Sequence, residues 1–396
     1  MIELKGKYNT AKVFTDNVEQ EAISQIIMLL NQEFAKDSVI RNMPDTHAGT
    51  GCTIGTTMTI HGKAVPYMVG VDIGCGMETV LLRDEHVELQ KLDRAIHENI
   101  PAGFTVRKDA HEMALSTRIH DLRCIKHVNL DRAYSSVGTL GGGNHFIELG
   151  KSEDERLYLV IHSGSRYLGK QVADFYQNAA VQQRKMDTRA AQELIDRLKA
   201  QGRENEIQKQ LKKIPISEVT KSLAWLDGQL LEDYLHDMEI TQEYADINRK
   251  CMAREILKAA GLKAEDSFAT VHNYIDIEHD ILRKGAISAQ DGERVLIPIN
   301  MRDGSLLCTG KGNPDWNWSA PHGAGRIMSR RQAKESITLT EYKAAMKGIY
   351  SSTVDKSTID EAPFAYKPME EIVANIGDTV TVNKIIRPLY NFKAAE

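Results

Sequence analysis

The chain has 396 residues, of which 42% are hydrophobic and 27% charged, and its formal net charge is −5. This composition is typical of a globular protein, and its apolar runs are too short to predict a membrane span. The negative net charge excludes a surface that attracts polyanions everywhere, but it is compatible with a local basic groove.

The cysteines favour a reducing compartment. There are five, an odd number, scattered from Cys52 to Cys308 with no CxxC pair. This spacing does not fit a disulfide framework, and the first residues lack the pattern of a signal peptide. We therefore expect a cytoplasmic protein.

The predicted elements mix helices and strands. Residues 17–36 have helical periodicity, and β segments follow within 50–82 as TIGTTMTI, AVPYMVGVDI and METVLL. Further strands are predicted at 156–163, 267–277, 285–299 and 378–392. Residues 188–214 predict a charged, solvated helical hairpin, with a nucleic-acid-contacting arm as the alternative, and 216–261 predict two more helices. We expect one α+β domain over 1–396, with a β-rich core and a helical insertion at about 186–262.

One short stretch combines a carboxylate and a thiol. In VDIGCGMETV, Asp72 and Cys75 lie three residues apart, and glycines flank the cysteine. Packing, redox chemistry and metal binding are all compatible with such a cysteine, and a lone Asp-x-x-Cys is a weak signal for any of them.

Histidines in glycine-rich or strand-end settings strengthen the metal interpretation. They are His47, His145, His162, His272 and His322. Imidazole, thiolate and carboxylate together suit Mn²⁺, Zn²⁺, Co²⁺ or Fe²⁺ better than Mg²⁺ or Ca²⁺. The candidates are too many for one closed tetrahedral site, so they predict either two metals or an open catalytic metal.

A second set of residues predicts phosphate binding. Arg166 follows a Ser-Gly turn in HSGSR, Lys284 lies in RKGA, and Arg330 follows HGAG in HGAGRIMSR. Guanidinium groups match phosphate oxygens in a bidentate manner, and the start of a helix attracts anions. A solvated helix start is the competing interpretation of the last segment.

These motifs together resemble a known family. The ordered set MPDTHAGTGCTIG, GVDIGCGM, GTLGGGNHFIE, HSGSR, RKGA, HGAGRIMSR and DEAPFAYK resembles the RtcB RNA ligases, which are GTP- and manganese-dependent enzymes of RNA splicing and repair. The matches run from about residue 43 to the C-terminal RPLYNFK. The resemblance implies an RtcB-like ligase domain of a divergent, bacterial-type branch.

The resemblance also implies roles for individual residues. Two Mn²⁺ ions, with Zn²⁺ or Co²⁺ as alternatives, would be held by Asp72, Cys75, His145, His162 and His272, with Cys75 as the bridging thiolate. His322 matches the histidine that attacks GTP and carries GMP, and Asp45 and His47 lie in an active-site motif. Guanylate-binding positions are Asn144, Glu148, Asn273, Ser305, Tyr366 and Lys393, and RNA phosphate-binding positions are Arg166, Lys284 and Arg330.

The implied reaction joins an RNA 3′-phosphate or 2′,3′-cyclic phosphate end to a 5′-hydroxyl end, in tRNA splicing or RNA repair. No membrane partner is implied, and the oligomeric state stays open. Pro321 and Asn300 depart from the family pattern, where serine is usual at both positions. These departures leave an alternative open, a metal-dependent RNA cyclic phosphodiesterase that shares the site without ligating. A non-catalytic relative is disfavoured because no proposed ligand or nucleophile is missing.

Overall fold

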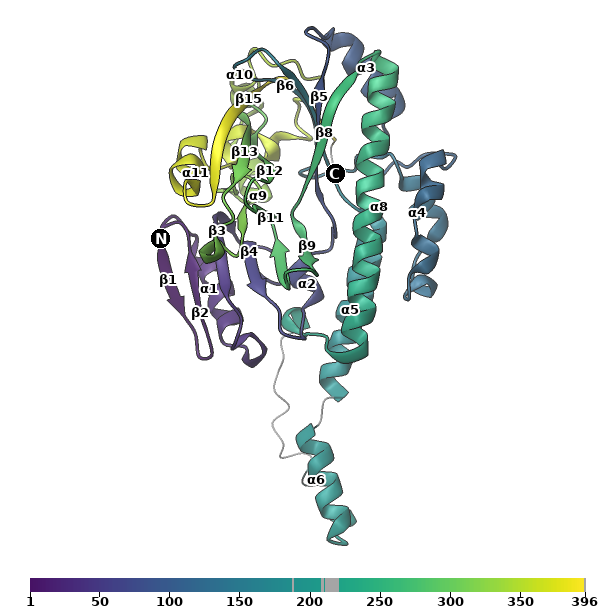
Figure 1. The fold of residues 1–396 in the computed structure, drawn as a ribbon, viewed down its shortest axis with the longest axis vertical. Coiled ribbons are helices and arrows are strands. Elements are labelled where there is room, and N and C mark those ends of the chain that lie inside the picture. Colours follow the sequence, from purple (N-terminus) through teal and green to yellow (C-terminus); the bar gives the residue numbers. More distant parts are fainter. Residues whose placement is uncertain (187–188, 208–209, 211–220, 395–396) are drawn as a thin grey trace.

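The computed structural model describes residues 1–186, 189–207, 210 and 221–394 (Figure 1). Helices and strands are mixed along the chain and the strands form the centre, which confirms the predicted α+β class. Among the residues that the structure describes, none of the helices combines the length and apolar composition that crossing a bilayer requires.

A six-stranded sheet is formed largely by the N-terminal part. Its strand order is β1-β2-β3-β4-β10-β9, and only the β2–β3 pair is parallel. The strands are β1 (Ile2–Lys5), β2 (Thr10–Val13), β3 (Ile40–His47), β4 (Ile54–Thr59), β9 (Asn273–Asp276) and β10 (Ile281–Lys284).

A seven-stranded antiparallel sheet has the order β12-β13-β15-β6-β7-β5-β8. Its strands are β5 (Gly76–Leu82), β6 (Phe146–Lys151), β7 (Leu157–Ser163), β8 (Ala264–Val271), β12 (Arg294–Asn300), β13 (Gly304–Gly310) and β15 (Val380–Lys393). A third, two-stranded sheet pairs β11 (Ala286–Ser288) with β14 (Ser319–Pro321). Every residue of β7 is buried, as expected for a strand covered on both faces.

Helices surround these sheets. They are α1 (Gln20–Leu30), α2 (Pro66–Val69), α3 (Leu89–Asn99), α4 (Leu130–Ser136), α5 (Arg166–Met186), α6 (Arg189–Ala200), α8 (Gly228–Ala260), α9 (Arg330–Ser336), α10 (Leu339–Ala345) and α11 (Met369–Ile376). The long helix α8 packs against α3, α5 and β7 and runs along one side of the molecule, whereas α6 lies away from the sheets (Figure 1). Gly261 ends α8 in the left-handed conformation, at φ 74°, that glycine adopts without strain.

Most predicted elements are present, with three corrections. AVPYMVGVDI is not a strand, because its centre forms the helical turn α2, which starts at Pro66. The predicted strands 267–277 and 285–299 are each divided, the first into β8 and β9 around His272 and the second into β11 and β12. Of the stretch 188–214, α6 is a helix, while 208–209 and 211–214 lie outside the described residues. Residues 216–220 also lie outside them, and α8 alone occupies most of 221–261, where two helices were predicted.

Candidate active site

The predicted metal ligands meet at one edge of the seven-stranded sheet. The strands β6, β7, β5 and β8 are neighbours in this order and are antiparallel. His145 directly precedes β6, His162 is near the end of β7, Cys75 directly precedes β5, and His272 directly follows β8. Because alternate strands run in opposite directions, all four positions fall at the same edge. The register confirms this, since Met77 and Phe146 both pair with His162.

The candidate ligands form two groups that share Cys75. One group is Asp72, Cys75 and His145, and the other is Cys75, His162 and His272; within each group the donor atoms lie within 4.8 Å of one another. The Cys75 Sγ lies 3.4 Å from Nε2 of His145 and 3.3 Å from Nε2 of His162. Two groups around one thiol are the arrangement that a thiolate bridging two cations requires.

The polar atoms of this cluster are better arranged to bind cations than to form hydrogen bonds with one another. Nδ1 of His145 lies 2.9 Å from the Leu140 carbonyl, and Nδ1 of His162 lies 3.1 Å from the Asn144 carbonyl. If Nδ1–H of His162 donates to its carbonyl, its Nε2 is an acceptor that faces the Cys75 thiol, while Nε2 of His145 faces both that thiol and an Asp72 carboxylate oxygen at 3.0 Å. Nδ1 of His272 is buried and has no hydrogen-bond partner among the described residues. Cations would satisfy these converging atoms.

Burial and neighbouring charges set the protonation of the ligands. Burial lowers the pKa of His162 and His272 well below the ordinary value, so both imidazoles are neutral and able to ligate. Burial opposes ionisation of Asp72, but the hydrogen bond and charge of His145 and the nearby Arg166 outweigh it and keep the Asp72 pKa low. Burial and then Asp72 raise the pKa of Cys75, so its thiolate needs a cation beside it.

Helix α8 holds the loops that carry the ligands. The Asn248 side chain accepts hydrogen bonds from the backbone N–H groups of Gly138 (2.8 Å) and Thr139 (3.0 Å) and donates to the Gly164 carbonyl (3.0 Å). Arg249, which is fully buried, donates to the carbonyls of Gly74 (2.7 Å) and Ser163 (3.0 Å). One helix therefore fixes the turn before Cys75, the loop before His145 and the end of β7.

Arg166 lies at the end of the cluster formed by Asp72 and His145. Its Nη1 lies 3.1 Å from Nδ1 of His145, and its Nε is buried without a hydrogen-bond partner among the described residues. The Asp72 carboxylate accepts from the Ser165 N–H at 3.0 Å and contacts Gly164 so closely that a Cβ there would lie 2.3 Å from Oδ1. The Ser-Gly turn of HSGSR thus helps to position the Asp72 carboxylate.

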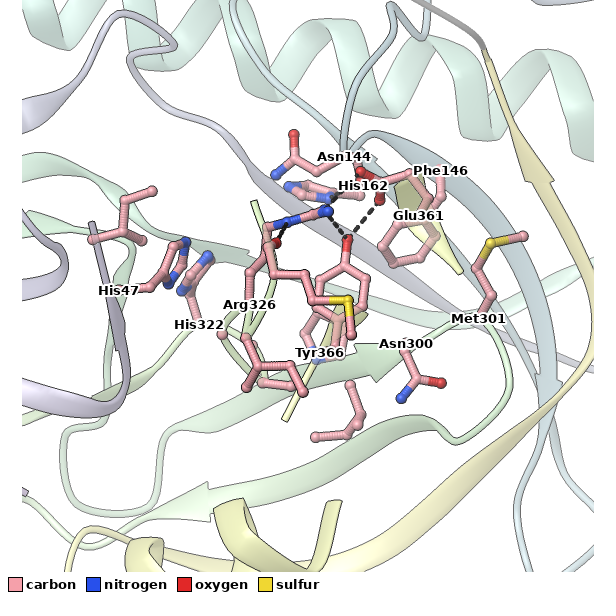
Figure 2. A pocket seen from close by; sticks show the side chains of 18 of the residues that line it. His47, Asn144, Phe146, His162, Asn300, Met301, His322, Arg326, Glu361 and Tyr366 are labelled. Carbon is pink, nitrogen blue, oxygen red and sulfur yellow. Dashed lines mark hydrogen bonds and ion pairs between the residues drawn. The ribbon is translucent and has the colours of Figure 1, made fainter. Parts of the chain in front are cut away.

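His322 extends the row of imidazoles. Its ring lies 4.8 Å from the His272 ring between centroids, and the His272 and His162 rings are 5.2 Å apart. Its Nδ1 lies 2.6 Å from Oδ2 of the fully buried Asp45, which also accepts from the Gly323 N–H. With Nδ1–H donating to this carboxylate, Nε2 keeps a free electron pair. His47 lies beside His322 (Figure 2), its Nδ1 is 2.8 Å from the Asp45 carbonyl, and burial lowers its pKa.

A cavity of about 660 Å³ opens beside His322. This volume is within the range of about 300–1,000 Å³ that is usual for small-molecule sites. His47, His162, His322, Asn144, Glu148, Ser305, Tyr366 and Lys393 are among the residues that line it. Oε1 of Glu148, Oγ of Ser305 and Oδ1 of Asn391 are buried in its wall with no hydrogen-bond partner among the described residues. These groups fit a polar ligand, because a buried polar group without a partner costs free energy.

Glu361 organises the charged side of the cavity. Its side chain is 3% exposed; Oε2 lies 2.6 Å from the Tyr366 hydroxyl, and Oε1 lies 3.2 Å from Arg326 (Figure 2). In addition, Oε2 lies 2.5 Å from Lys393 Nζ and Oε1 lies 3.1 Å from Arg330. Burial opposes ionisation, but Lys393, Arg330 and Arg326 together lower the Glu361 pKa. The Glu361 carboxylate thus positions three positively charged side chains in the cavity wall.

The remaining predicted residues, Asn273, Lys284 and Arg330, make contacts of their own near the site. Asn273 does not line the cavity; it donates to the Asp72 carbonyl (3.2 Å) and accepts from the Gly285 N–H (3.0 Å). Lys284 is buried and donates to the carbonyls of Thr50 and Tyr67. Arg330 lines the cavity and pairs with Asp360 at 2.9 Å.

The structure also shows the surroundings of Asn300 and Pro321, the two residues that depart from the family pattern. The Asn300 Oδ1 accepts from the N–H groups of Arg302 (3.0 Å) and Asp303 (2.9 Å), so its side chain stabilises the turn between β12 and β13 at the cavity wall. Pro321 ends β14 opposite Ala286 and presents no N–H beside His322.

Sequence reasoning missed Asn248, Arg249, Glu361 and Asn391 as contributors to the site. Glu361 lies in DEAPFAYK and Asn391 in RPLYNFK, so position within a motif was an available signal for both. Asn248 and Arg249 lie in a charged helical segment with no such signal.

Known proteins are similar to this chain along nearly its whole length. Residues 33–394 match the family described as tRNA-splicing ligase RtcB. The chain is 30% identical to the RNA-splicing ligase RtcB of Escherichia coli over an alignment 410 positions long, which covers 93% of each chain. It is 27% identical to the tRNA-splicing ligase RtcB of Aeropyrum pernix, covering 95% of this chain and 92% of the relative, and 27% identical to the RNA-splicing ligase RtcB of Mycobacterium tuberculosis, covering 87% and 94%. The chain therefore belongs to the RtcB family and is an RNA ligase.

Proposed function

We propose that this ligase is GTP- and manganese-dependent and works through a guanylylated His322. It would join an RNA 3′-phosphate or 2′,3′-cyclic phosphate end to a 5′-hydroxyl end. The carrying observation is the position of His322, whose Nδ1 faces Asp45 while the ring adjoins both His272 and the cavity. A nitrogen nucleophile needs this combination of an oriented ring, a free electron pair and a neighbouring cation site.

The proposed cation site consists of Asp72, Cys75, His145, His162 and His272. Its imidazole, thiolate and carboxylate donors accept Mn²⁺ and also Zn²⁺ or Co²⁺. When bound, the cations would neutralise charge on the phosphate oxygens and on the departing pyrophosphate.

The chain's own residues supply the remaining functions. Nε2 of His322 attacks the α-phosphorus of GTP, a P–N bond forms, and the P–O bond to pyrophosphate breaks. Asp45 holds the imidazole through Nδ1 and stabilises the positive charge that develops on the ring, as a buried carboxylate does in other histidine-dependent sites. Lys393, Arg326 and Arg330, placed by Glu361, face the anionic nucleotide. Oε1 of Glu148 and Oγ of Ser305, which have no partner among the described residues, are available to the guanine.

Two transfers follow. An oxygen of the RNA 3′-phosphate attacks the His322-bound phosphorus and breaks the P–N bond, which leaves GMP joined to the RNA end as an anhydride. The 5′-hydroxyl of the other RNA then attacks the terminal RNA phosphorus, its proton is lost, and GMP leaves. For a cyclic end, water first opens the ring to a 3′-phosphate.

The direct test is covalent labelling. The protein is incubated with Mn²⁺ and GTP labelled at the α-phosphate, and the acid-labile adduct is measured. We expect the adduct in the unchanged protein and none in His322→Ala. His279→Ala is the matched control, because His279 is exposed and pairs only with Asp276 among the described residues, so it should keep the adduct.

The same assay distinguishes ligation from the second candidate function, a cyclic phosphodiesterase. Pro321 removes a backbone N–H next to the proposed nucleophile, which favours a cyclic phosphodiesterase that does not ligate. Hydrolysis of a 2′,3′-cyclic phosphate end without any adduct would replace the ligation mechanism by this alternative.

A further inference from the structure

Two buried side chains meet across neighbouring strands in the cavity wall. Glu148 on β6 and Asn391 on β15 lie opposite one another in the antiparallel register, and they are only 2% and 1% exposed. The Asn391 Nδ2–H donates to Oε2 of Glu148 at 2.9 Å. Oε1 of Glu148 and Oδ1 of Asn391 have no hydrogen-bond partner among the described residues. The pair therefore leaves two buried acceptor oxygens unused.

Both acceptors lie on the cavity side of the sheet. Glu148 and Asn391 line the cavity, whereas Ile147 and Phe392, the adjacent pair in the register, belong to the hydrophobic core. Successive side chains of a strand point to opposite faces of the sheet, which explains this division. Because the other face is apolar, a ligand in the cavity is the partner available to the two oxygens.

The position of Glu148 along the chain favours the base of a nucleotide over its phosphates. His145 belongs to the metal-ligand cluster, and Glu148 follows three residues later, within β6. At about 3.3 Å per residue of strand, Glu148 and Asn391 are about 10 Å from the metal-ligand edge. A nucleotide with its phosphates at that edge would bring its base to these two side chains.

The hydrogen-bonding capacity of the two oxygens matches guanine. The Watson–Crick edge of guanine has an N1–H donor next to a 2-amino group, whereas adenine has an acceptor at N1 and no 2-amino group. A carboxylate oxygen and an amide oxygen are both acceptors. Oε1 of Glu148 and Oδ1 of Asn391 can therefore accept from N1–H and from the 2-amino group together. Hypoxanthine, which lacks only the amino group, would leave one of the two acceptors unpaired.

We propose that Asn391 is a specificity-determining residue for the guanine base, and that its Oδ1 accepts a hydrogen bond from the 2-amino group. Its Nδ2–H holds the Glu148 carboxyl group so that Oε1 accepts from N1–H. This inference rests on the proposed function, because it names the residue that selects the nucleotide. A base without the amino group is disfavoured, since it leaves the Asn391 oxygen buried and unpaired.

The test measures binding without the covalent step. GMP and IMP, which differ only in the 2-amino group, are titrated separately into the Mn²⁺-loaded protein, and calorimetry gives both dissociation constants. We expect IMP to bind about 5- to 150-fold more weakly than GMP, the range for a buried polar group left unpaired. Both nucleotides present the same N1–H to Glu148, so the free energy of ionising that buried group cancels in the ratio. Asn391→Leu, which conserves the shape of the side chain, should abolish the preference for GMP.

Asn383→Leu is the matched control and should keep the preference, since Asn383 lies on the same strand but is exposed and bonds to Thr309. Thermal melting checks the fold, and Asn391→Ser, whose side chain is too short to reach the base, gives the same comparison if the leucine variant does not fold. Equal affinities for GMP and IMP in the unchanged protein would overturn the inference, as would an undiminished preference in a folded Asn391 variant. Failure of the proposed function is a separate result, because it appears as a missing GMP adduct after incubation with labelled GTP.

Discussion

The two ends of the active site are stabilised by different kinds of contact. At the metal-ligand end, the ligand loops are tied by backbone carbonyls and by Asn248 and Arg249 of α8. At the cavity end, Glu361 holds charged side chains, and Glu148, Ser305 and Asn391 each keep a buried oxygen without a partner among the described residues. The first end is shaped before any ligand arrives. The second contains groups whose bonding a ligand would complete or replace.

The largest expected effect is at the metal-ligand end. Cys75→Ser should lower metal affinity by at least about 100-fold. Even residues that only hydrogen-bond to a metal ligand change metal affinity by about 10- to 100-fold when they are replaced. Ligation should fall below detection while the melting curve stays cooperative, since the substitution conserves shape. Metal content by mass spectrometry checks this result. Cys308→Ala, at a buried cysteine remote from the ligands, should keep its metal, and a metal-replete, active Cys75→Ser protein would remove Cys75 from the site.

A smaller effect, confined to nucleotide binding, is expected at the cavity end. Glu361→Gln keeps the side-chain shape but removes the charge that holds Lys393, Arg326 and Arg330. We expect the KM for GTP to rise by about 10- to 100-fold with a smaller change in kcat, because charge-assisted hydrogen bonds contribute about 1.5–3 kcal/mol. Glu335→Gln, at an exposed pair with Arg331, is the control. An unchanged KM for GTP would show that Glu361 does not position these cations for the nucleotide.

The smallest effect is a pH dependence of stability that comes from Glu148. Burial raises the Glu148 pKa to about 8, against the hydrogen bond of Asn391 and the charge of Lys393, which lower it. Between its ordinary value near 4.5 and about 8, the folded protein binds this proton more tightly than the unfolded chain does. Stability from this group is therefore present at low pH and is lost as pH rises through that window.

Glu148→Gln resembles the protonated side chain at every pH. Its melting temperature relative to the unchanged protein should therefore rise steadily from pH 5 to pH 8 and level off above. Melting curves across this range in the absence of nucleotide measure the difference. A constant difference would mean that Glu148 titrates near its ordinary value.

The sequence was sufficient to predict that the candidate ligands come together, because short motifs contain them. Asp72 and Cys75 lie in one turn, and the histidines lie directly beside strand ends, so correct strands bring them to one edge. The α2 error arose because a short apolar run fits a strand and a buried helical turn equally well. Pro66 at the first helical position was the signal that favoured the helix.

The supporting residues could not be predicted in the same way. Asn248 lies more than 80 residues from each backbone group that it bonds, and its role depends on where α8 packs. Glu361 reaches Lys393 and Arg326 only because β15 and the loop before α9 meet beside it. Such contacts are set by tertiary packing, for which local periodicity contains no information.

The bonds from α8 to the ligand loops have a consequence for cooperativity. The N–H groups of Gly138 and Thr139, both bonded to Asn248, should exchange with solvent only when the helix itself opens. The ligand loops and α8 then form one unfolding unit, which extends through packing to α3 and α5. A cation bound at the sheet edge would stabilise that whole unit by mass action. Amide exchange in α8, and in the helices that pack against it, should therefore slow when a cation is bound at the site.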